Sequence, residues 1–317
     1  MKVFITRELP ETVFELLRKS KISFDYYKKD RPIPRKLLLQ KVKKCEALIS
    51  LLTEKIDREV IDKMKDCKII ANYAVGYNNI DIDYAKKKNI IVTNTPDVLT
   101  ESTADLTMAL VLACARRLPE GENLLRNGKY KGWKPKLLLG TELKNKTFGI
   151  LGAGRIGTAV AIRAKSFGTN IIYFDNKKNL KLEKVTNARK VKLNNLLRNS
   201  DFISVHLPLN DKTFQYLNKE KLNQLKENSI LVNTSRGEII DERELIKLLK
   251  RENNISVGLD VFENEPKLNP ELLKFPNVLV LPHLGSATNE ARDAMAELAV
   301  KNVINVLKGK PPLSPVF

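Results

Sequence analysis

The stretch TFGILGAGRIG, residues 147–157, places glycines directly after a run of apolar residues. Gly152, Gly154 and Gly157 have the spacing GxGxxG, and the residues that follow have the apolar period of a helix. In a dinucleotide-binding turn, the first glycine permits the tight bend, the second lets the backbone approach a pyrophosphate, and the third lets helix and strand pack closely. The N-terminus of the helix would meet the negative charge. The stretch predicts such a turn, although a strand–turn–helix without a ligand can carry the same glycines.

An acidic residue follows where the next strand is expected to end. Asp175 closes the run NIIYFD (170–175), about 20 positions after the glycines, which is the spacing of a residue that binds an adenosine ribose. A carboxylate there accepts hydrogen bonds from ribose hydroxyls and repels a 2′-phosphate, so it favours NAD over NADP. Lys177 and Lys178 are close in sequence and could partly reverse this preference, which leaves NADP open.

Strand-like runs alternate with amphipathic runs along the whole chain, and this alternation predicts an α/β protein with two doubly wound parallel sheets. A long buried helix is predicted over 100–118, with Ser102 and Asp105 at the spacing of an N-terminal cap. An irregular loop over 127–146 and a last helix over 288–308 are also predicted. The predicted strands are 2–6, 47–52, 68–75 and 90–95 in a first unit, and one beginning at 147, then 170–175, 201–209, 229–235, 256–262 and 277–283 in a second.

The composition limits the class of protein. A chain of 317 residues with 43% hydrophobic and 29% charged residues is expected to fold into two globular domains. The net charge of +19 comes from lysines scattered along the chain, which indicates a solvated surface rather than a nucleic-acid site. The most apolar stretch, 106–115, is shorter than a membrane span, and the charged residues at the start of the sequence lead us to expect no secretory signal. Cys45, Cys67 and Cys114 lack a CxxC pattern, so we expect reduced thiols, a cytoplasmic location and no metal site.

Polar residues follow several of the predicted strands at the point where each strand ends. His206, Arg236, Asp260 and His283 each end or follow such a strand, and Glu265 comes shortly after Asp260. The carboxyl ends of parallel strands meet at one edge of a sheet, where doubly wound folds bind their ligands. The chain has only two histidines, and both are in this set. The pattern predicts a catalytic site at that edge.

Further stretches join the glycine stretch in a pattern that runs in order nearly from end to end: VGYNNID (75–81), TNTPDVLTESTAD (93–105), LVNTSRGEIID (231–241), GLDVFENEP (258–266) and LPHLGSAT (281–288). On these stretches the chain resembles the D-isomer-specific 2-hydroxyacid dehydrogenases. Within that family, VFITRELP (3–10) and ANYAVGYNNID (71–81) make it most similar to the enzymes that reduce glyoxylate and hydroxypyruvate.

The resemblance implies that Arg236, Glu265 and His283 are catalytic in the reduction of a small 2-keto acid by NAD(P)H. Imidazolium is a suitable proton donor near neutral pH, so His283 would protonate the carbonyl oxygen. A carboxylate on the other ring nitrogen would fix the tautomer, which gives Glu265 its role. The planar guanidinium of Arg236 can pair with the carboxylate of the substrate and polarise its carbonyl.

Further site residues are implied by the same resemblance. The backbone N–H groups of Val75 and Gly76 would bind the substrate carboxylate, and Asn72 and Leu52 would line the same pocket. The residues implied to bind the cofactor are Gly152, Gly154, Arg155, Ile156, Gly157, Asp175, His206, Pro208, Thr234, Ser235, Arg236, Asp260, His283, Gly285 and Ser286.

The resemblance also implies the domain organisation. Residues 1–99, completed by 287–317, would form a flavodoxin-like substrate domain, and 100–286 would form a Rossmann domain that binds the cofactor and supplies a homodimer surface. The active site would lie between the domains, with a small anionic acid as substrate and with no nucleic acid or membrane as partner.

Three alternative functions stay open. Leu137 stands where some reductases of the family carry an aromatic residue, which puts the preferred keto acid in question. Phosphoglycerate dehydrogenase and D-lactate dehydrogenase are alternatives within the family. A basic regulatory protein that senses nucleotides on the same fold is an alternative from another class.

Overall fold

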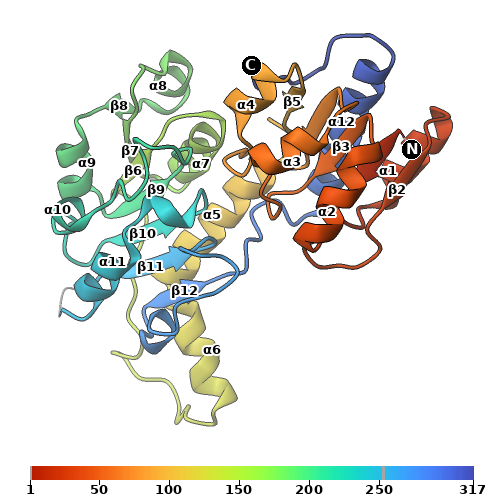
Figure 1. Ribbon diagram of the computed structural model, residues 1–317. Coiled ribbons are helices and arrows are strands. Elements are labelled where there is room, and N and C mark those ends of the chain that lie inside the picture. Colours follow the sequence, from red (N-terminus) through yellow and green to blue (C-terminus); the bar gives the residue numbers. More distant parts are fainter. Residues whose placement is uncertain (1, 252–253) are drawn as a thin grey trace. The chain divides into compact units, whose positions relative to one another are not determined.

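A computed structural model of the chain describes residues 2–251 and 254–317. The chain divides into two compact units (Figure 1). The first unit comprises residues 1–99 and 287–317, and the second comprises 100–286.

A parallel sheet forms the centre of the first unit, with the strand order β2-β1-β3-β4-β5. This is the order 2-1-3-4-5 of flavodoxin-like doubly wound folds, so the predicted fold class is confirmed for this unit. The strands are β1 (Val3–Ile5), β2 (Phe24–Tyr26), β3 (Ala47–Ser50), β4 (Ile69–Asn72) and β5 (Ile91–Thr93).

Helices cover both faces of this sheet. On one face, Leu38 of α2 and Val60 of α3 share a buried cluster with sheet residues such as Leu48. Helices α1 and α12 pack against each other and cover the opposite face. Because both faces are covered, β3 and β4 are buried at every position instead of at alternate ones. The helices are α1 (Glu11–Lys19), α2 (Arg35–Lys41), the short 3-10 helix η1 (Val42–Lys44), α3 (Arg58–Lys63), α4 (Ile82–Lys87) and α12 (Asn289–Leu307).

The second unit has a parallel sheet with the strand order β12-β11-β10-β9-β6-β7-β8. The chain leaves β6 toward β7 on one side and returns to β9 on the other, so the order reverses between β6 and β9 as in a Rossmann fold, where ligands bind. The strands are β6 (Thr147–Leu151), β7 (Asn170–Phe174), β8 (Arg189–Lys190), β9 (Phe202–Val205), β10 (Ile230–Asn233), β11 (Ser256–Leu259) and β12 (Val278–Val280).

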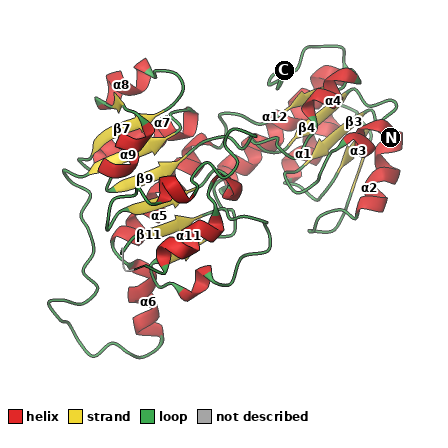
Figure 2. Cartoon of the chain, turned by 60° about the vertical axis from the view of Figure 1, so that its left-hand side comes forward, coloured by secondary structure: helices red, strands yellow, loops and turns green. Residues whose placement is uncertain are grey.

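Helices also lie on both sides of the second sheet (Figure 2). Residues of α5 and α7 share one buried cluster with Phe148 and Val232, and residues of α9 and α11 share another with Leu231. Alternate residues of β10 thus enter opposite cores. The helices are α5 (Thr100–Ala115), α6 (Leu118–Arg126), α7 (Arg155–Ser166), α8 (Leu180–Thr186), α9 (Leu193–Asn199), α10 (Lys219–Leu222), η2 (Gly237–Ile239), α11 (Glu242–Leu249) and η3 (Leu272–Lys274).

The structure differs from the sequence prediction at the long helix over 100–118. That helix ends at Ala115, Arg117 takes a left-handed backbone conformation, and Pro119 lies in the first turn of the separate helix α6. Proline cannot continue a helix because it lacks an N–H and clashes with the preceding turn. The predicted N-terminal cap at Ser102 is wrong, since α5 begins at Thr100 and Ser102 lies within it.

None of the helices in the described residues combines the length and the apolar character needed to cross a membrane.

Candidate active site

The glycine turn joins β6 to α7 and has little room for side chains. Gly152 has a φ of 99°, and a Cβ there would lie 2.7 Å from the carbonyl oxygen of His206. At Gly157 a Cβ would overlap the carbonyl oxygen of Gly152. A Cβ at Gly154 would meet nothing within 4 Å, so the space beside this residue is open. Because the first N–H groups of a helix lack intrahelical acceptors, the turn and the start of α7 fit a phosphate group of a dinucleotide.

Asp175 stands beside this turn, directly after β7. One of its carboxylate oxygens accepts a hydrogen bond of 2.8 Å from the N–H of Ala153. The other accepts a longer one of 3.4 Å from the backbone N–H of Lys177, so it has acceptor capacity left for a ribose hydroxyl. Lys178 forms an ion pair with Glu183 at 3.1 Å. One of the two lysines that could attract the 2′-phosphate of NADP is therefore already paired with a carboxylate.

His283 and Glu265 form a pair. His283 Nδ1 lies 2.9 Å from Glu265 Oε2, and the two side chains are 26% and 27% exposed. The other oxygen of Glu265 accepts a hydrogen bond from the N–H of Phe262, so both oxygens are engaged and one orientation is favoured. With the carboxylate as acceptor, Nδ1 carries a hydrogen, and Nε2 is the nitrogen at which a proton can be held and transferred.

Asp260 holds the backbone on which His283 stands. Its fully buried carboxylate accepts hydrogen bonds from the N–H groups of Leu284 (2.6 Å) and Gly285 (2.8 Å), and its carbonyl accepts one from His283 N. Burial raises the pKa of Asp260, while the two N–H groups act in the opposite direction. The hydroxyls of Ser102 and Thr103 in α5 donate to the carbonyl of Gly285 at 3.0 Å. The loop of His283 is thus fixed from both sides.

Arg236 follows β10 in a loop that Asn233 organises. The Asn233 amide donates to the carbonyl of Arg236 at 2.8 Å, and Arg236 Nη1 donates to the carbonyl of Ser235 at 2.7 Å. Burial lowers the pKa of Arg236, and the charges of Glu265 and Glu238 act in the opposite direction. The guanidinium therefore lies within the electrostatic reach of Glu265, which itself contacts His283. The structure thus brings together the three residues that the sequence predicted to be catalytic.

The remaining cofactor-side residues lie at the same edge of the second sheet. Thr234 shares a hydrogen bond of 2.8 Å with Thr107 of α5, and the Ser235 hydroxyl donates to Asn233. These contacts place the residues at strand ends and leave their binding roles as proposals. Pro208 follows β9, Thr234 and Ser235 follow β10, Asp260 follows β11, Gly285 and Ser286 follow β12, and Arg155 and Ile156 begin α7.

The predicted substrate residues lie in the first unit, at the ends of β3 and β4. Asn72 is the last residue of β4 and is fully buried, and its side chain donates to the carbonyl of Gly76 at 2.8 Å. Val75 and Gly76 lie in the loop after β4, and Leu52 follows β3 with 37% of its surface exposed.

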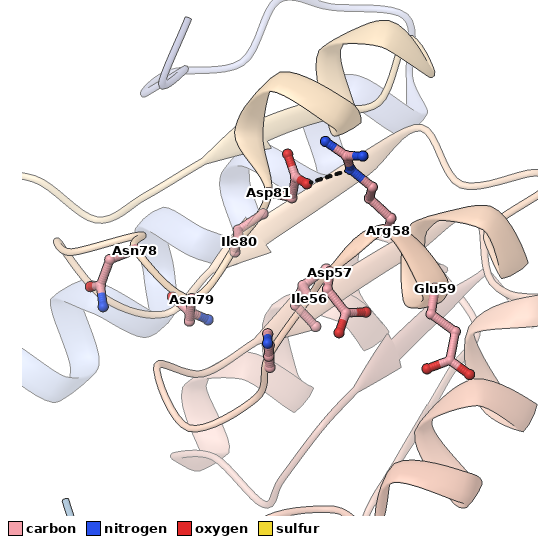
Figure 3. A pocket seen from close by; sticks show the side chains of 9 residues that line it. Ile56, Asp57, Arg58, Glu59, Asn78, Asn79, Ile80 and Asp81 are labelled. Atoms are coloured by element: carbon pink, nitrogen blue, oxygen red, sulfur yellow. Dashed lines mark hydrogen bonds and ion pairs between the residues drawn. The ribbon is translucent and has the colours of Figure 1, made fainter. Parts of the chain in front are cut away.

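A hollow in the first unit is separate from these residues. It is lined by residues 55–59 and 78–81 (Figure 3). Arg58 and Asp81 form an ion pair of 3.3 Å across it. The side chains of Asp57 and Asp81 accept hydrogen bonds from backbone N–H groups in the first turns of α3 and α4, respectively. These charged groups stabilise the local structure, and no predicted site residue lines the hollow.

Gly237 was missed by sequence reasoning, although it determines how the loops of Arg236 and Glu265 meet. A Cβ on Gly237 would overlap the backbone of Phe262 and Glu263. Gly237→Ala is expected to lower the free energy of unfolding by ~1–3 kcal/mol, because overpacking forces the backbone to shift. It should also lower turnover at least about tenfold, because the loops that carry Arg236 and Glu265, the residues predicted to be catalytic, would separate.

Urea unfolding and steady-state kinetics measure both effects of Gly237→Ala. The matched control is Gly121→Ala in α6, where the nearest atom would be 3.7 Å from the new Cβ. Unchanged stability and unchanged turnover in Gly237→Ala would show that the two loops do not depend on this close packing.

His206 predicts how stability depends on pH. Burial lowers its pKa from 6.5 to about 3, and its Nε2 contacts the Ser204 hydroxyl. Between these values the unfolded chain binds a proton that the folded chain does not. The free energy of unfolding is therefore not reduced by this histidine above about pH 6.5. It falls as the pH drops from 6.5 toward 3, by at most about 1.4 kcal/mol per pH unit. In His206→Gln, the free energy of unfolding from urea titrations should fall less steeply with decreasing pH. Equal slopes for both proteins would contradict this assignment.

A doubly wound sheet with this glycine turn, together with a histidine–carboxylate pair and an arginine at its strand ends, defines a dinucleotide-dependent oxidoreductase. Residues 108–285 match the family model described as D-isomer specific 2-hydroxyacid dehydrogenase, NAD binding domain. The chain belongs to the D-isomer specific 2-hydroxyacid dehydrogenase family, which confirms the family, the NAD(P) cofactor and the reduction of a keto acid that the sequence predicted.

The relatives cover nearly the whole chain. The chain is 48% identical over 315 residues to a glyoxylate reductase of Thermococcus litoralis, covering 98% of this chain and 95% of the relative. It is 45% identical to a glyoxylate reductase of Pyrococcus horikoshii, with coverages of 98% and 94%. The crystal structure of the TT0316 protein from Thermus thermophilus is 40% identical, with a TM-score of 0.93 and full coverage of both chains.

Proposed function

We propose that this protein reduces glyoxylate or hydroxypyruvate to the corresponding 2-hydroxy acid, with the D configuration where the product is chiral. The observation that carries this proposal is the 2.9 Å contact between His283 Nδ1 and Glu265, whose charge also acts on Arg236. Similarity to two glyoxylate reductases supports glyoxylate as a substrate.

Each of the three side chains has one task in the proposed mechanism. When bound, NAD(P)H supplies the hydride that adds to the carbonyl carbon. Arg236 pairs with the substrate carboxylate and polarises the carbonyl. His283 transfers a proton from Nε2 to the carbonyl oxygen. Glu265 keeps the hydrogen on Nδ1 and stabilises the imidazolium before the transfer, so the neutral ring that remains is the correct tautomer.

The two units have separate roles in this proposal. Residues 100–286 hold the cofactor, and residues 1–99 with 287–317 bind the substrate. The N–H groups of Val75 and Gly76 would bind the carboxylate, because backbone donors and an arginine together match a planar anion. Asp175, with its free acceptor capacity beside the glycine turn, favours NADH over NADPH.

One kinetic panel tests this function. The initial rate of NADH oxidation is measured with glyoxylate, hydroxypyruvate, pyruvate and 3-phosphohydroxypyruvate, and then with NADPH. We expect the highest kcat/KM with glyoxylate or hydroxypyruvate, and a preference for NADH. A higher value with pyruvate or with the phosphorylated acid would favour D-lactate or phosphoglycerate dehydrogenase. A preference for NADPH above about tenfold would overturn the role of Asp175. No turnover, together with salt-dependent DNA binding, would favour a regulatory protein.

We also propose a homodimer formed through α6 and the loop after it. No residue of α6 is buried, and Trp133 is 81% exposed. Apolar side chains exposed on neighbouring segments favour association, because a partner removes them from water. The other exposed apolar residues of this surface are Leu118, Leu125, Tyr130 and Leu139. Light scattering should give twice the chain mass of 36.0 kDa, and a monomer would contradict the proposal.

Three cysteines support the predicted cytoplasmic location. Cys45, Cys67 and Cys114 are buried and unpaired, and free thiols of this kind are typical of reducing compartments.

A further inference from the structure

The loop after β4 has its backbone carbonyls engaged one after another. The carbonyl of Ala74 accepts a hydrogen bond of 3.0 Å from Thr95 N, that of Val75 accepts one of 2.8 Å from the Asn94 amide, and that of Gly76 accepts one of 2.8 Å from the Asn72 amide. Three successive peptide groups are therefore fixed by donors outside the loop.

Fixing the carbonyls also fixes the N–H groups. In a trans peptide, the C=O of one residue and the N–H of the next point in opposite directions. The bond to the Ala74 carbonyl therefore orients Val75 N–H, and the Asn94 bond to the Val75 carbonyl orients Gly76 N–H. Among the described residues, neither N–H has a hydrogen-bond acceptor. Both are directed away from residues 94–95 and are free to bind an anion.

Asn94 is held in turn by the segment 313–316, which lies along the end of β5. Asn94 N donates to the carbonyl of Ser314 at 3.3 Å, and the Ser314 hydroxyl donates to the carbonyl of Asn94 at 2.7 Å. Thr93 and Pro315 form an antiparallel bridge, and Val316 N donates to Val92 at 2.9 Å. The C-terminus lies near β5 and α4 in Figure 1.

Asn302 of α12 anchors this segment from the inside. It is fully buried, and all the hydrogen-bonding positions of its amide are used. Its nitrogen donates to the carbonyl of Leu298 (2.9 Å) and to the Ser314 hydroxyl (2.8 Å), and its oxygen accepts from the N–H groups of Leu313 (2.7 Å) and Ser314 (3.1 Å). Hydrogen bonds thus connect a buried residue of α12 to the Val75 carbonyl through Ser314 and Asn94.

We propose that Asn94, supported by Ser314, is a positioning residue that orients the Gly76 N–H, next to that of Val75, toward the carboxylate of the 2-keto acid. This rests on the proposed function, in which that loop binds the substrate carboxylate. Asn94 acts through the loop of the first unit, whereas the residues proposed to bind the cofactor belong to the second unit. Its loss should weaken substrate binding and leave cofactor binding and the proton transfer by His283 intact.

The test compares the wild type with Asn94→Ala and Ser314→Ala. For Asn94→Ala, the KM for glyoxylate should rise at least about tenfold, while the KM for NADH stays within about twofold and kcat within about threefold. Calorimetric binding of oxalate, an unreactive analogue, to the enzyme saturated with NADH should weaken by the same factor. Ser314→Ala should show a smaller change in the same direction, and it serves as the test if Asn94→Ala does not fold.

The matched control is Asn305→Ala. Asn305 also lies on α12 and donates to the chain before the segment 313–316, at Pro311, but it has no bond to Ser314 or Asn94. Its variant should keep the wild-type KM for glyoxylate. The inference would be overturned if both test variants kept the wild-type KM for glyoxylate and the wild-type affinity for oxalate. It would also be overturned if kcat fell and the KM values for glyoxylate and NADH rose by the same factor. If none of the tested 2-keto acids makes the wild type oxidise NADH, the proposed function itself fails, and the inference fails with it.

Discussion

His283→Asn is expected to lower kcat for the reduction of the keto acid by about 100- to 10,000-fold, which is the range that a positioned general acid contributes. The asparagine amide can donate a hydrogen bond near the position of the ring, but it cannot transfer a proton at neutral pH. The pairing of Nδ1 with Glu265 leaves Nε2 for the proposed proton transfer. The other histidine of the chain, His206, follows β9, which β10 and β11 separate from β12 in the sheet. Steady-state kinetics with saturating NADH and glyoxylate give the measurement.

Cofactor binding separates this effect from a failure to fold. NADH fluorescence titration of His283→Asn should give a Kd within about threefold of the wild type, because the glycine turn and Asp175 lie on other segments of the second unit. Turnover near that of the wild type would show that another group supplies the proton and that the role of His283 is wrong.

Arg236→Gln is expected to lower kcat/KM for the keto acid by about 30- to 5,000-fold. Removing one partner of a buried, hydrogen-bonded charge pair costs about 2–5 kcal/mol, and here the substrate carboxylate would lose its cation. The charge of Glu265 acts on the guanidinium, and the Asn233 amide fixes the backbone carbonyl of Arg236. Arg236→Lys should restore part of the loss, because a lysine keeps the charge but not the planar two-point contact.

Arg243→Lys is the matched control for the arginine variants. Arg243 is exposed on α11, seven residues further along the chain, and it should keep the wild-type kcat/KM. If Arg236→Gln retained the wild-type KM and kcat with glyoxylate, the anion-binding role of Arg236 would be excluded.

The predictions from sequence succeeded where the signal is local. The glycine spacing could be recognised because a Cβ at Gly152 or Gly157 would collide with backbone atoms, so any sequence that forms this turn needs glycine there. The positions of Arg236 and His283 follow from a rule of parallel sheets, in which the carboxyl ends of the strands meet at one edge. The fold class and the cluster of these side chains could therefore be predicted without coordinates.

The parts that the sequence did not predict depend on contacts between distant segments. Ser102 and Thr103 hold the loop of His283 from more than 180 residues away, and no spacing in the chain indicates this. Gly237 is restricted by the backbone at Phe262, which only the packed sheet brings near. The edge strands β2 and β8 were also missed, because short, partly or fully exposed strands carry almost no apolar pattern.

The most direct test of the central claim is the reaction of the wild-type protein with hydroxypyruvate and NADH, followed by chiral analysis of the glycerate. In the proposed mechanism, His283 gives the proton and the bound cofactor gives the hydride. We therefore expect one NADH to be oxidised for each glycerate formed, and the glycerate to have the D configuration. L-glycerate as product, or no oxidation of NADH that depends on the keto acid, would contradict the account.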